Sequence, residues 1–122
     1  MKHILIIDDD PAVRDVLNEI VATFGYDPHP VDSAKEAVSR LTKGRIDLIF
    51  LDISMPEITG DQLLEFIRKK GFQTPVVVIS AHVDEAVEAR LRAAGVSGIL
   101  EKPFEVSDVI DLMEEALTRQ KK

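Results

Sequence analysis

The stretch that decides the fold is Ile4-Leu5-Ile6-Ile7-Asp8-Asp9-Asp10-Pro11. Four consecutive apolar residues indicate a strand that is buried on both faces, which is typical of a parallel sheet. Three aspartates follow the strand, Asp10 is a good helix N-cap, and Pro11 fits the first position of a helix. The segment therefore predicts a strand over residues 4–7 that leads into a helix through an acidic loop.

This alternation of an apolar run and an amphipathic stretch occurs five times along the chain. Further strands are predicted at residues 28–31, 46–51, 76–79 and 97–100, and further helices at 33–42, 61–70, 84–94 and from about 106 onward. The first helix ends at Gly25 and has apolar residues at the 3.6-residue period, namely Val13, Val16, Leu17, Ile20, Val21 and Phe24. Because Pro28 and Pro30 remove hydrogen-bond donors, we expect the strand at 28–31 to lie at a sheet edge.

Five strand–helix units predict an α/β fold. We expect a flavodoxin-like (βα)5 architecture, in which a doubly wound, parallel five-stranded sheet of order 2-1-3-4-5 has helices on both faces. A length of 122 residues suits one domain, so residues 1–122 are predicted to form a single domain. The helix at 84–94 has a thin apolar face of Val87, Leu91 and Ala94, which predicts low local stability.

Composition excludes several classes of protein. The absence of cysteine rules out disulfide scaffolds, thiolate metal sites and iron–sulfur clusters. No apolar run approaches the roughly 18 residues of a membrane span, and no secretory signal is recognisable, so we expect a cytoplasmic protein without a membrane segment. The net charge of −7 and the lack of a dense Lys/Arg stripe argue against direct nucleic-acid binding.

Polar residues follow the predicted strands at the points where each strand ends. They are Asp8, Asp9 and Asp10, then Asp52, then Ser80, and finally Glu101-Lys102-Pro103. Ligands of an open parallel sheet bind beyond the carboxyl ends of its strands, so we expect these side chains to converge. Clustered carboxylates without histidine or cysteine beside them favour a hard cation, and Mg²⁺ is the candidate. A carboxylate among cations can also attack phosphorus and form an aspartyl phosphate.

Four segments resemble the signature segments of response-regulator receiver domains, the CheY-like domains of two-component signal transduction. They are Ile6-Ile7-Asp8-Asp9-Asp10-Pro11, Leu51-Asp52-Ile53-Ser54-Met55-Pro56 with Gly60, Val78-Ile79-Ser80-Ala81 and Glu101-Lys102-Pro103-Phe104. The similarity runs in order from the first strand to the last helix. It implies a single receiver domain over residues 1–122, with no output domain in this chain.

The resemblance implies a metal site and a phosphorylation site. Asp52 resembles the phosphoacceptor, which is also a metal ligand. Asp9 resembles the direct Mg²⁺ ligand, with Asp8 beside it, and the backbone carbonyl of Ser54 resembles a further ligand. Asp52 is thereby identified as the residue that would carry the phosphoryl group.

Two more residues resemble the family's phosphoryl-binding pair. Ser80 resembles the hydroxyl that turns toward the phosphoryl group, and Lys102 resembles the lysine that pairs with a phosphoryl oxygen, followed by a bond to Pro103 that is usually cis. Ser54 and His82 resemble positions that tune hydrolysis. Where many receivers carry Tyr or Phe as a switch, three residues before the lysine, this chain has Ile99.

The resemblance implies a regulatory phosphoacceptor, not an enzyme, which catalyses only its own phosphorylation and dephosphorylation. The implied phosphodonor is a sensor histidine kinase or a histidine phosphotransfer protein, and the downstream target is a protein or an output domain. The helix at 84–94, the strand at 97–100 and the last helix would form the output surface, which is also a candidate homodimer surface.

Other functions use the same residues. A small Mg²⁺-dependent phosphatase or phosphotransferase would also form an aspartyl phosphate, a receiver that is never phosphorylated would act by docking alone, and a flavodoxin-like module would bind flavin. The flavin alternative lacks aromatic residues, because the chain has no Trp and a single Tyr, Tyr26. His3 and His29 have no predicted partners, and we expect both at the surface.

Overall fold

The computed structural model describes residues 1–53 and 60–120. Along the chain the elements are β1 (His3–Ile7), α1 (Pro11–Thr23), β2 (Asp27–Val31), α2 (Ala34–Lys43), β3 (Leu48–Asp52), α3 (Gly60–Lys69), β4 (Val76–Ser80), α4 (Glu85–Ala93), β5 (Gly98–Glu101) and α5 (Val106–Gln120). The strands form one parallel sheet in the order β2-β1-β3-β4-β5. The predicted fold class and strand order are therefore confirmed, and the proline-containing β2 lies at an edge.

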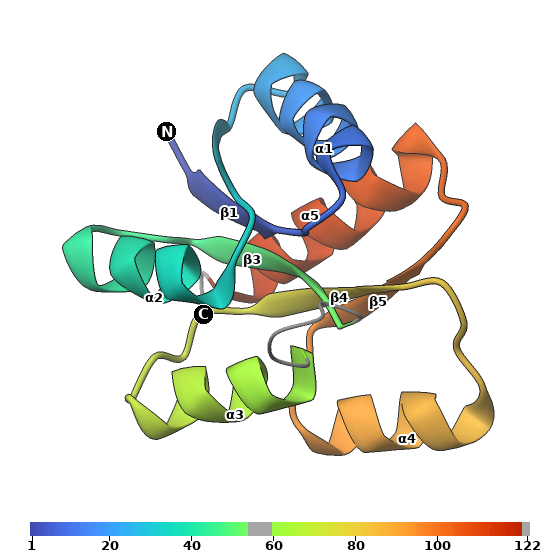
Figure 1. The fold of residues 1–122 in the computed structure, drawn as a ribbon. Helices are drawn as coiled ribbons and strands as arrows, with labels where there is room; N and C mark the ends of the chain where they lie inside the picture. The colour runs from blue at the N-terminus through green and yellow to red at the C-terminus, as the bar shows by residue number, and fades with distance from the viewer. Residues whose placement is uncertain (54–59, 121–122) are drawn as a thin grey trace.

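The sheet is covered on both faces, as Figure 1 shows. Helices α1 and α5 lie on one face, and α2, α3 and α4 lie on the other. Neighbouring residues of β1 point in opposite directions, so Ile4 and Ile6 belong to the core under α1 and α5, whereas Leu5 and Ile7 belong to the opposite core. Burial on both faces explains why β1, β3 and β4 are uninterrupted apolar runs.

The apolar stripe predicted for α1 is wider than the surface that the helix buries. Leu17, Ile20 and Val21 are buried, but Val16 and Phe24 are 47% and 48% exposed. Val16 lies at the flank of the stripe, and Phe24 is the C-cap residue, where the chain leaves the helix. The buried face of α1 is therefore narrower than the apolar stripe that the 3.6-residue period marks.

Of the helices α1, α2 and α4, helix α4 has the smallest buried face. Leu91 is its only buried residue, Val87 is half-buried, and Ala94 is the exposed C-cap residue instead of part of the core. No helix within the described ranges is both long enough and apolar enough to cross a membrane.

Candidate functional site

The topology of the sheet brings three carboxylates together. Asp8 and Asp9 follow β1, and Asp52 is the last residue of the neighbouring strand β3. Ile7 is in register with Leu51, so Asp8 and Asp52 occupy matching positions at the carboxyl ends of their strands. One carboxylate oxygen from each of Asp8, Asp9 and Asp52 lies within 4.8 Å of the others. This group, which we call the acidic cluster, is the convergence that the sequence predicts.

Lys102 supplies a cation on the side of the cluster that faces β5. Its Nζ lies 3.8 Å from Oδ2 of Asp8 and 3.9 Å from Oδ2 of Asp52. Two carboxylates repel each other at this range, and a shared ammonium group offsets part of that repulsion. The predicted approach of Lys102 to Asp52 is therefore present in the structure.

Asp8 is the most constrained member of the acidic cluster. Its side chain is fully buried, and Oδ1 accepts a hydrogen bond of 2.9 Å from the backbone N–H of Asp10. Burial raises the pKa of Asp8 to about 6, and the neighbouring Asp52 also raises it, whereas the Asp10 amide and Lys102 lower it. Its Oδ2 has no hydrogen-bond partner among the described residues.

A buried carboxylate oxygen without a donor is costly unless something else compensates its charge. The candidate metal ligands of the acidic cluster are all carboxylate oxygens, from Asp8, Asp9 and Asp52. Asp9 is exposed, so solvent can reach the cluster there. Such a set suits Mg²⁺, which binds one or two carboxylates and keeps several waters. The residues present therefore fit a hard divalent cation.

The loop after β1 is held by α1. Asp10 caps the helix, because its Oδ1 accepts a 3.0 Å hydrogen bond from the N–H of Ala12, as the sequence predicts. Arg14 Nη1 donates a 2.8 Å hydrogen bond to the main-chain carbonyl of Asp8. Arg14 is not among the predicted site residues, and its only signal in the sequence is a basic residue one turn after the acidic loop. It fixes the backbone that carries the cluster.

Ser80 ends β4 and is buried. Its Oγ donates a 3.0 Å hydrogen bond to the carbonyl of His82 and accepts one of 3.3 Å from the N–H of His82. The main-chain carbonyl of Ser80 accepts a 2.9 Å hydrogen bond from the N–H of Lys102. Ser80 is thus linked to Lys102 through the backbone, and its hydroxyl binds its own loop. The bond between Lys102 and Pro103 is cis, as the resemblance implies.

Ser54 and Ile99 are the two remaining positions singled out in the sequence. Ser54, whose main-chain carbonyl is a predicted metal ligand, lies outside the described residues. Ile99 is half-buried in β5 and packs against the core cluster that contains Leu91. The side chain at this position therefore contacts the same core as α4.

The expectation that His3 and His29 have no partners is wrong, although both side chains are partly exposed at the surface. They contact each other and Asp27, at the end of the sheet away from the acidic cluster. The buried Asp47 was also missed: it accepts hydrogen bonds from the N–H of His3 and from Arg45 Nε. Burial raises the pKa of Asp47, but these two hydrogen bonds and the positive charges of Arg45 and Lys2 together bring the pKa below its usual value.

Known proteins match this chain along nearly its whole length. A family model for the response regulator receiver domain matches residues 4–114. The response regulator protein FleR of Pseudomonas aeruginosa is 36% identical over 112 residues, which make up 90% of this chain and 23% of FleR. The response regulator SaeR of Staphylococcus aureus is 30% identical over 122 residues, 100% of this chain and 53% of SaeR. The chain thus spans about half of SaeR and less of FleR.

Solved structures agree with these relatives. The response regulator receiver domain protein (CheY-like) from Methanospirillum hungatei JF-1 has a TM-score of 0.91 at 26% identity, covering 99% of this chain and 97% of that one. NtrX from Brucella abortus has a TM-score of 0.92 at 30% identity, covering 99% of this chain and 28% of that one. With its fold, its acidic cluster and its match over residues 4–114, the chain belongs to the response regulator receiver domain family, a regulatory and non-enzymatic domain of two-component signalling.

Proposed function

We propose that this domain is a phosphoacceptor switch, in which Asp52 receives a phosphoryl group from a phosphohistidine in a Mg²⁺-dependent reaction. The donor would be a sensor histidine kinase or a histidine phosphotransfer protein. The observation that carries the proposal is the acidic cluster, where Oδ2 of the buried Asp8 has no hydrogen-bond partner among the described residues and Lys102 lies 3.9 Å from Asp52. These groups supply a nucleophile, a cation site and a phosphate-binding ammonium in one place.

The transfer is a displacement at phosphorus. A carboxylate oxygen of Asp52 forms the new O–P bond while the N–P bond of the donor histidine breaks, and the bonding electrons return to the imidazole. Asp8, Asp9, Asp52 and the main-chain carbonyl of Ser54 would hold Mg²⁺, which would neutralise charge on the phosphoryl oxygens when bound. Attack by water on the aspartyl phosphate later releases inorganic phosphate and restores Asp52.

Lys102 and Ser80 would respond to the negative charge of the phosphoryl group on Asp52. The ammonium group of Lys102 pairs with a phosphoryl oxygen, and the hydroxyl of Ser80 exchanges the carbonyl of His82 for another phosphoryl oxygen. Movement of Ser80 displaces residues 80–84, which lead directly into α4. Output would therefore pass through α4, β5 and α5 to a downstream protein, an output domain or a second copy of this chain.

Exposed apolar side chains support docking of the donor on α1. Val16, Phe24 and Val106 are the exposed members, and with Glu19, Ile20 and Thr23 they line a shallow groove of about 330 Å³ between α1 and α5. Helix α1 begins at the acidic loop, so a protein bound along it lies close to the phosphoacceptor. We infer that this groove contributes to the contact with the phosphodonor.

Phosphorylation by acetyl phosphate tests the proposal without knowledge of the donor. Wild-type protein with Mg²⁺ should gain one phosphoryl group per chain, and chelation of Mg²⁺ should prevent it. Asp52→Asn should gain none, whereas Asp10→Asn, which alters the helix cap in the same acidic loop, should be phosphorylated like the wild type. Equal labelling of Asp52→Asn would refute the acceptor assignment. Continuous turnover of a phosphate ester would instead favour a phosphatase, and no labelling at all would favour a docking receiver.

A further inference from the structure

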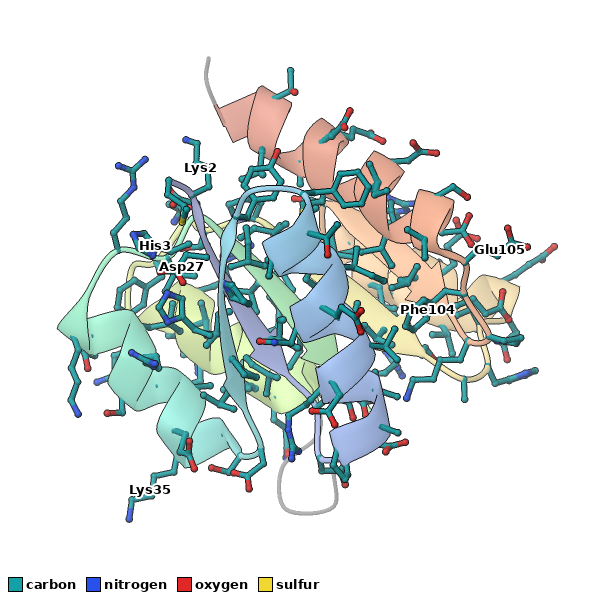
Figure 2. All side chains as sticks on the ribbon, turned by 90° about the horizontal axis from the view of Figure 1, so that it is seen from above. Lys2, His3, Asp27, Lys35, Phe104 and Glu105 are labelled. Carbon is teal, nitrogen blue, oxygen red and sulfur yellow. The ribbon has the colours of Figure 1, made fainter. Side chains whose placement is uncertain are left out.

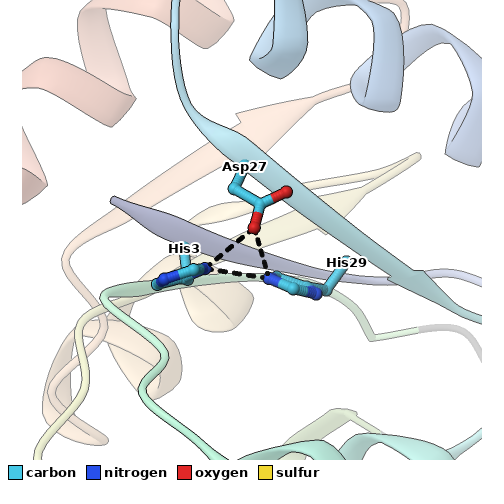
Figure 3. Close-up of side chains that lie close together, drawn as sticks. All are labelled: His3, Asp27 and His29. Atoms are coloured by element: carbon cyan, nitrogen blue, oxygen red, sulfur yellow. Dashed lines mark hydrogen bonds and ion pairs between the residues drawn. The ribbon is translucent and has the colours of Figure 1, made fainter. Parts of the chain in front are cut away.

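A second group of metal-ligating side chains lies at the other end of the sheet. His3 is the first residue of β1, Asp27 is the first residue of β2, and the register pairs His3 with Asp27 and Leu5 with His29. Side chains two residues apart on a strand share a face, so Asp27, His29 and the paired His3 project to the same side. Figure 2 places His3 and Asp27 side by side, and Figure 3 shows all three converging. We call them the histidine triad.

The three facing atoms form a small and nearly regular triangle. His3 Nδ1 lies 3.0 Å from Asp27 Oδ2 and 3.1 Å from His29 Nε2, and His29 Nε2 lies 3.4 Å from the same oxygen of Asp27. A tetrahedral Zn²⁺ site with bonds of about 2.0–2.1 Å has its ligand atoms about 3.3 Å apart. The triangle therefore matches one face of a zinc coordination tetrahedron.

Hydrogen bonds cannot satisfy all three contacts of this triangle at once. If both facing nitrogens carry a proton, both can donate to Oδ2 of Asp27, but the two donors then lie 3.1 Å from each other. If only one nitrogen carries a proton, at least one of the three contacts joins two acceptors. A cation at the centre of the three lone pairs would satisfy all of them at once.

The backbone that carries the histidine triad is constrained on both strands. His29 lies between Pro28 and Pro30, which restrict its backbone to extended conformations. The N–H of His3 donates to Asp47 Oδ2 at 2.8 Å, and the carbonyl of His3 accepts from the N–H of Asp47 at 2.8 Å. Ligands held in this way lose little conformational freedom on binding, which favours affinity.

The side chains of the histidine triad are accessible to solvent. The exposed fractions of the side chains are 35% for His3, 41% for Asp27 and 18% for His29. Partial exposure leaves an outward direction from which a cation can enter and a fourth ligand can bind. Two imidazoles and one carboxylate also differ in chemistry from the all-oxygen acidic cluster, because imidazole nitrogen prefers Zn²⁺ and its transition-metal neighbours to Mg²⁺.

We propose that His3, Asp27 and His29 form a Zn²⁺ site with three protein ligands and an open fourth position. The three ligands come from two adjacent strands at the amino end of the sheet, whereas the phosphoacceptor lies at the carboxyl end. The proposal is therefore independent of the proposed function. His3 would bind through Nδ1 and His29 through Nε2.

Zinc titration of the untagged chain tests the site. With Mg²⁺ in excess to occupy the acidic cluster, calorimetry or competition with a chromophoric chelator should give one Zn²⁺ per chain. Each of His3→Gln, Asp27→Asn and His29→Gln should weaken binding at least about tenfold. The matched control is His82→Gln, which removes the third histidine of the chain and should leave zinc binding unchanged. Circular dichroism of every variant separates lost ligation from lost folding.

Two outcomes would overturn the proposal. One is the absence of stoichiometric Zn²⁺ binding to wild-type protein, and the other is binding that survives both His29→Gln and Asp27→Asn. Nitrogen-15 NMR of the zinc-loaded wild type gives a readout that needs no variant. The His3 ring should keep its proton on Nε2 and the His29 ring on Nδ1, and any other pair of tautomers would contradict the proposed geometry.

Discussion

Asp8 combines complete burial with a negative charge, and its surroundings decide how much free energy the buried charge costs. The backbone of Asp10 satisfies one oxygen, while Lys102 stands 3.8 Å from the other, beyond hydrogen-bond distance. Burial raises the pKa of Asp8 to about 6, above the ordinary 3.8, so the folded protein holds a proton there more firmly than the unfolded chain does. Without a metal, ionisation of Asp8 therefore opposes folding.

The first prediction concerns stability without metal. Because the folded pKa of Asp8 is the higher one, its contribution to the free energy of unfolding is fully present below pH 3.8 and is lost as the pH rises through about 6. Asp8→Asn removes this loss and should stabilise the metal-free protein at pH 7.5 by about 1–3 kcal/mol. Urea denaturation in the presence of a chelator measures it. The stabilisation by Asp8→Asn should be smaller at pH 4.5 and after addition of Mg²⁺. If Asp8→Asn is less stable than the wild type at pH 7.5, burial of the charged Asp8 does not oppose folding.

The second prediction concerns Lys102 and Mg²⁺. The ammonium group neutralises Asp8 and Asp52 and thereby competes with any metal for the same carboxylates. Lys102→Met removes that competition, so Mg²⁺ should bind severalfold more tightly by calorimetry. Asp9→Asn should weaken Mg²⁺ binding, with Asp10→Asn as its control in the same loop. Weaker Mg²⁺ binding to Lys102→Met would show that Lys102 supports the metal site instead of opposing it.

Prediction from sequence succeeded for residues that the topology of the sheet alone brings together. Asp8, Asp52 and Lys102 lie at the carboxyl ends of strands, and parallel topology alone brings these ends together. The contact of His3 with His29 depends instead on the register of β1 against β2, which no local pattern encodes. Arg14 and Asp47 were missed because each forms a hydrogen bond with a main-chain group, on Asp8 and on His3 respectively, and no pattern of side chains in the sequence marks such a bond.

At the scale of elements, α1 and α4 differ in how they are anchored. Helix α1 buries Leu17, Ile20 and Val21 and packs beside α5, whereas α4 buries Leu91 alone. Both have N-cap side chains, Asp10 and Asp84, that accept hydrogen bonds from the first turn. Local capping is therefore similar, and the difference lies in buried apolar surface, which dominates helix stability in proteins.

The third prediction follows from that difference. Amide hydrogens of α4 should exchange with solvent faster than those of α1, because opening α4 exposes little apolar surface. Native-state hydrogen exchange measured by NMR or mass spectrometry gives the comparison directly. Equal protection of the two helices would contradict the proposal that α4 is the element that shifts when Ser80 and Lys102 move.

The order and type of the elements could be predicted from the apolar runs, because a run of consecutive apolar residues is the sequence signature of a strand that is buried on both faces. Strands β1, β3 and β4 are of this kind. The positions of Val16 and Phe24 did not follow. A helical period identifies an apolar stripe, but the width that is buried depends on the neighbours that cover it. These two residues are exposed in the groove between α1 and α5, where we propose that the phosphodonor docks.

At the scale of the whole molecule, the two ends of one parallel sheet carry different chemistry. The carboxyl end gathers oxygen ligands and a lysine, and the amino end gathers two imidazoles and a carboxylate. The interior residues of β1, β3 and β4, which lie between the two ends, are buried and apolar, so each end can bind its ligand without disturbing the core. Changes at Asp52 are therefore expected to reach partners through the loops and helices of the carboxyl end.

The central claim is that Asp52 accepts the phosphoryl group. Reduction of the phosphorylated protein with borohydride converts an aspartyl phosphate to homoserine, and peptide mass spectrometry then locates it. Homoserine should appear at position 52 alone, and only when Mg²⁺ and a phosphodonor are both present. Homoserine at Asp8 or Asp9, or at position 52 without Mg²⁺, would contradict it.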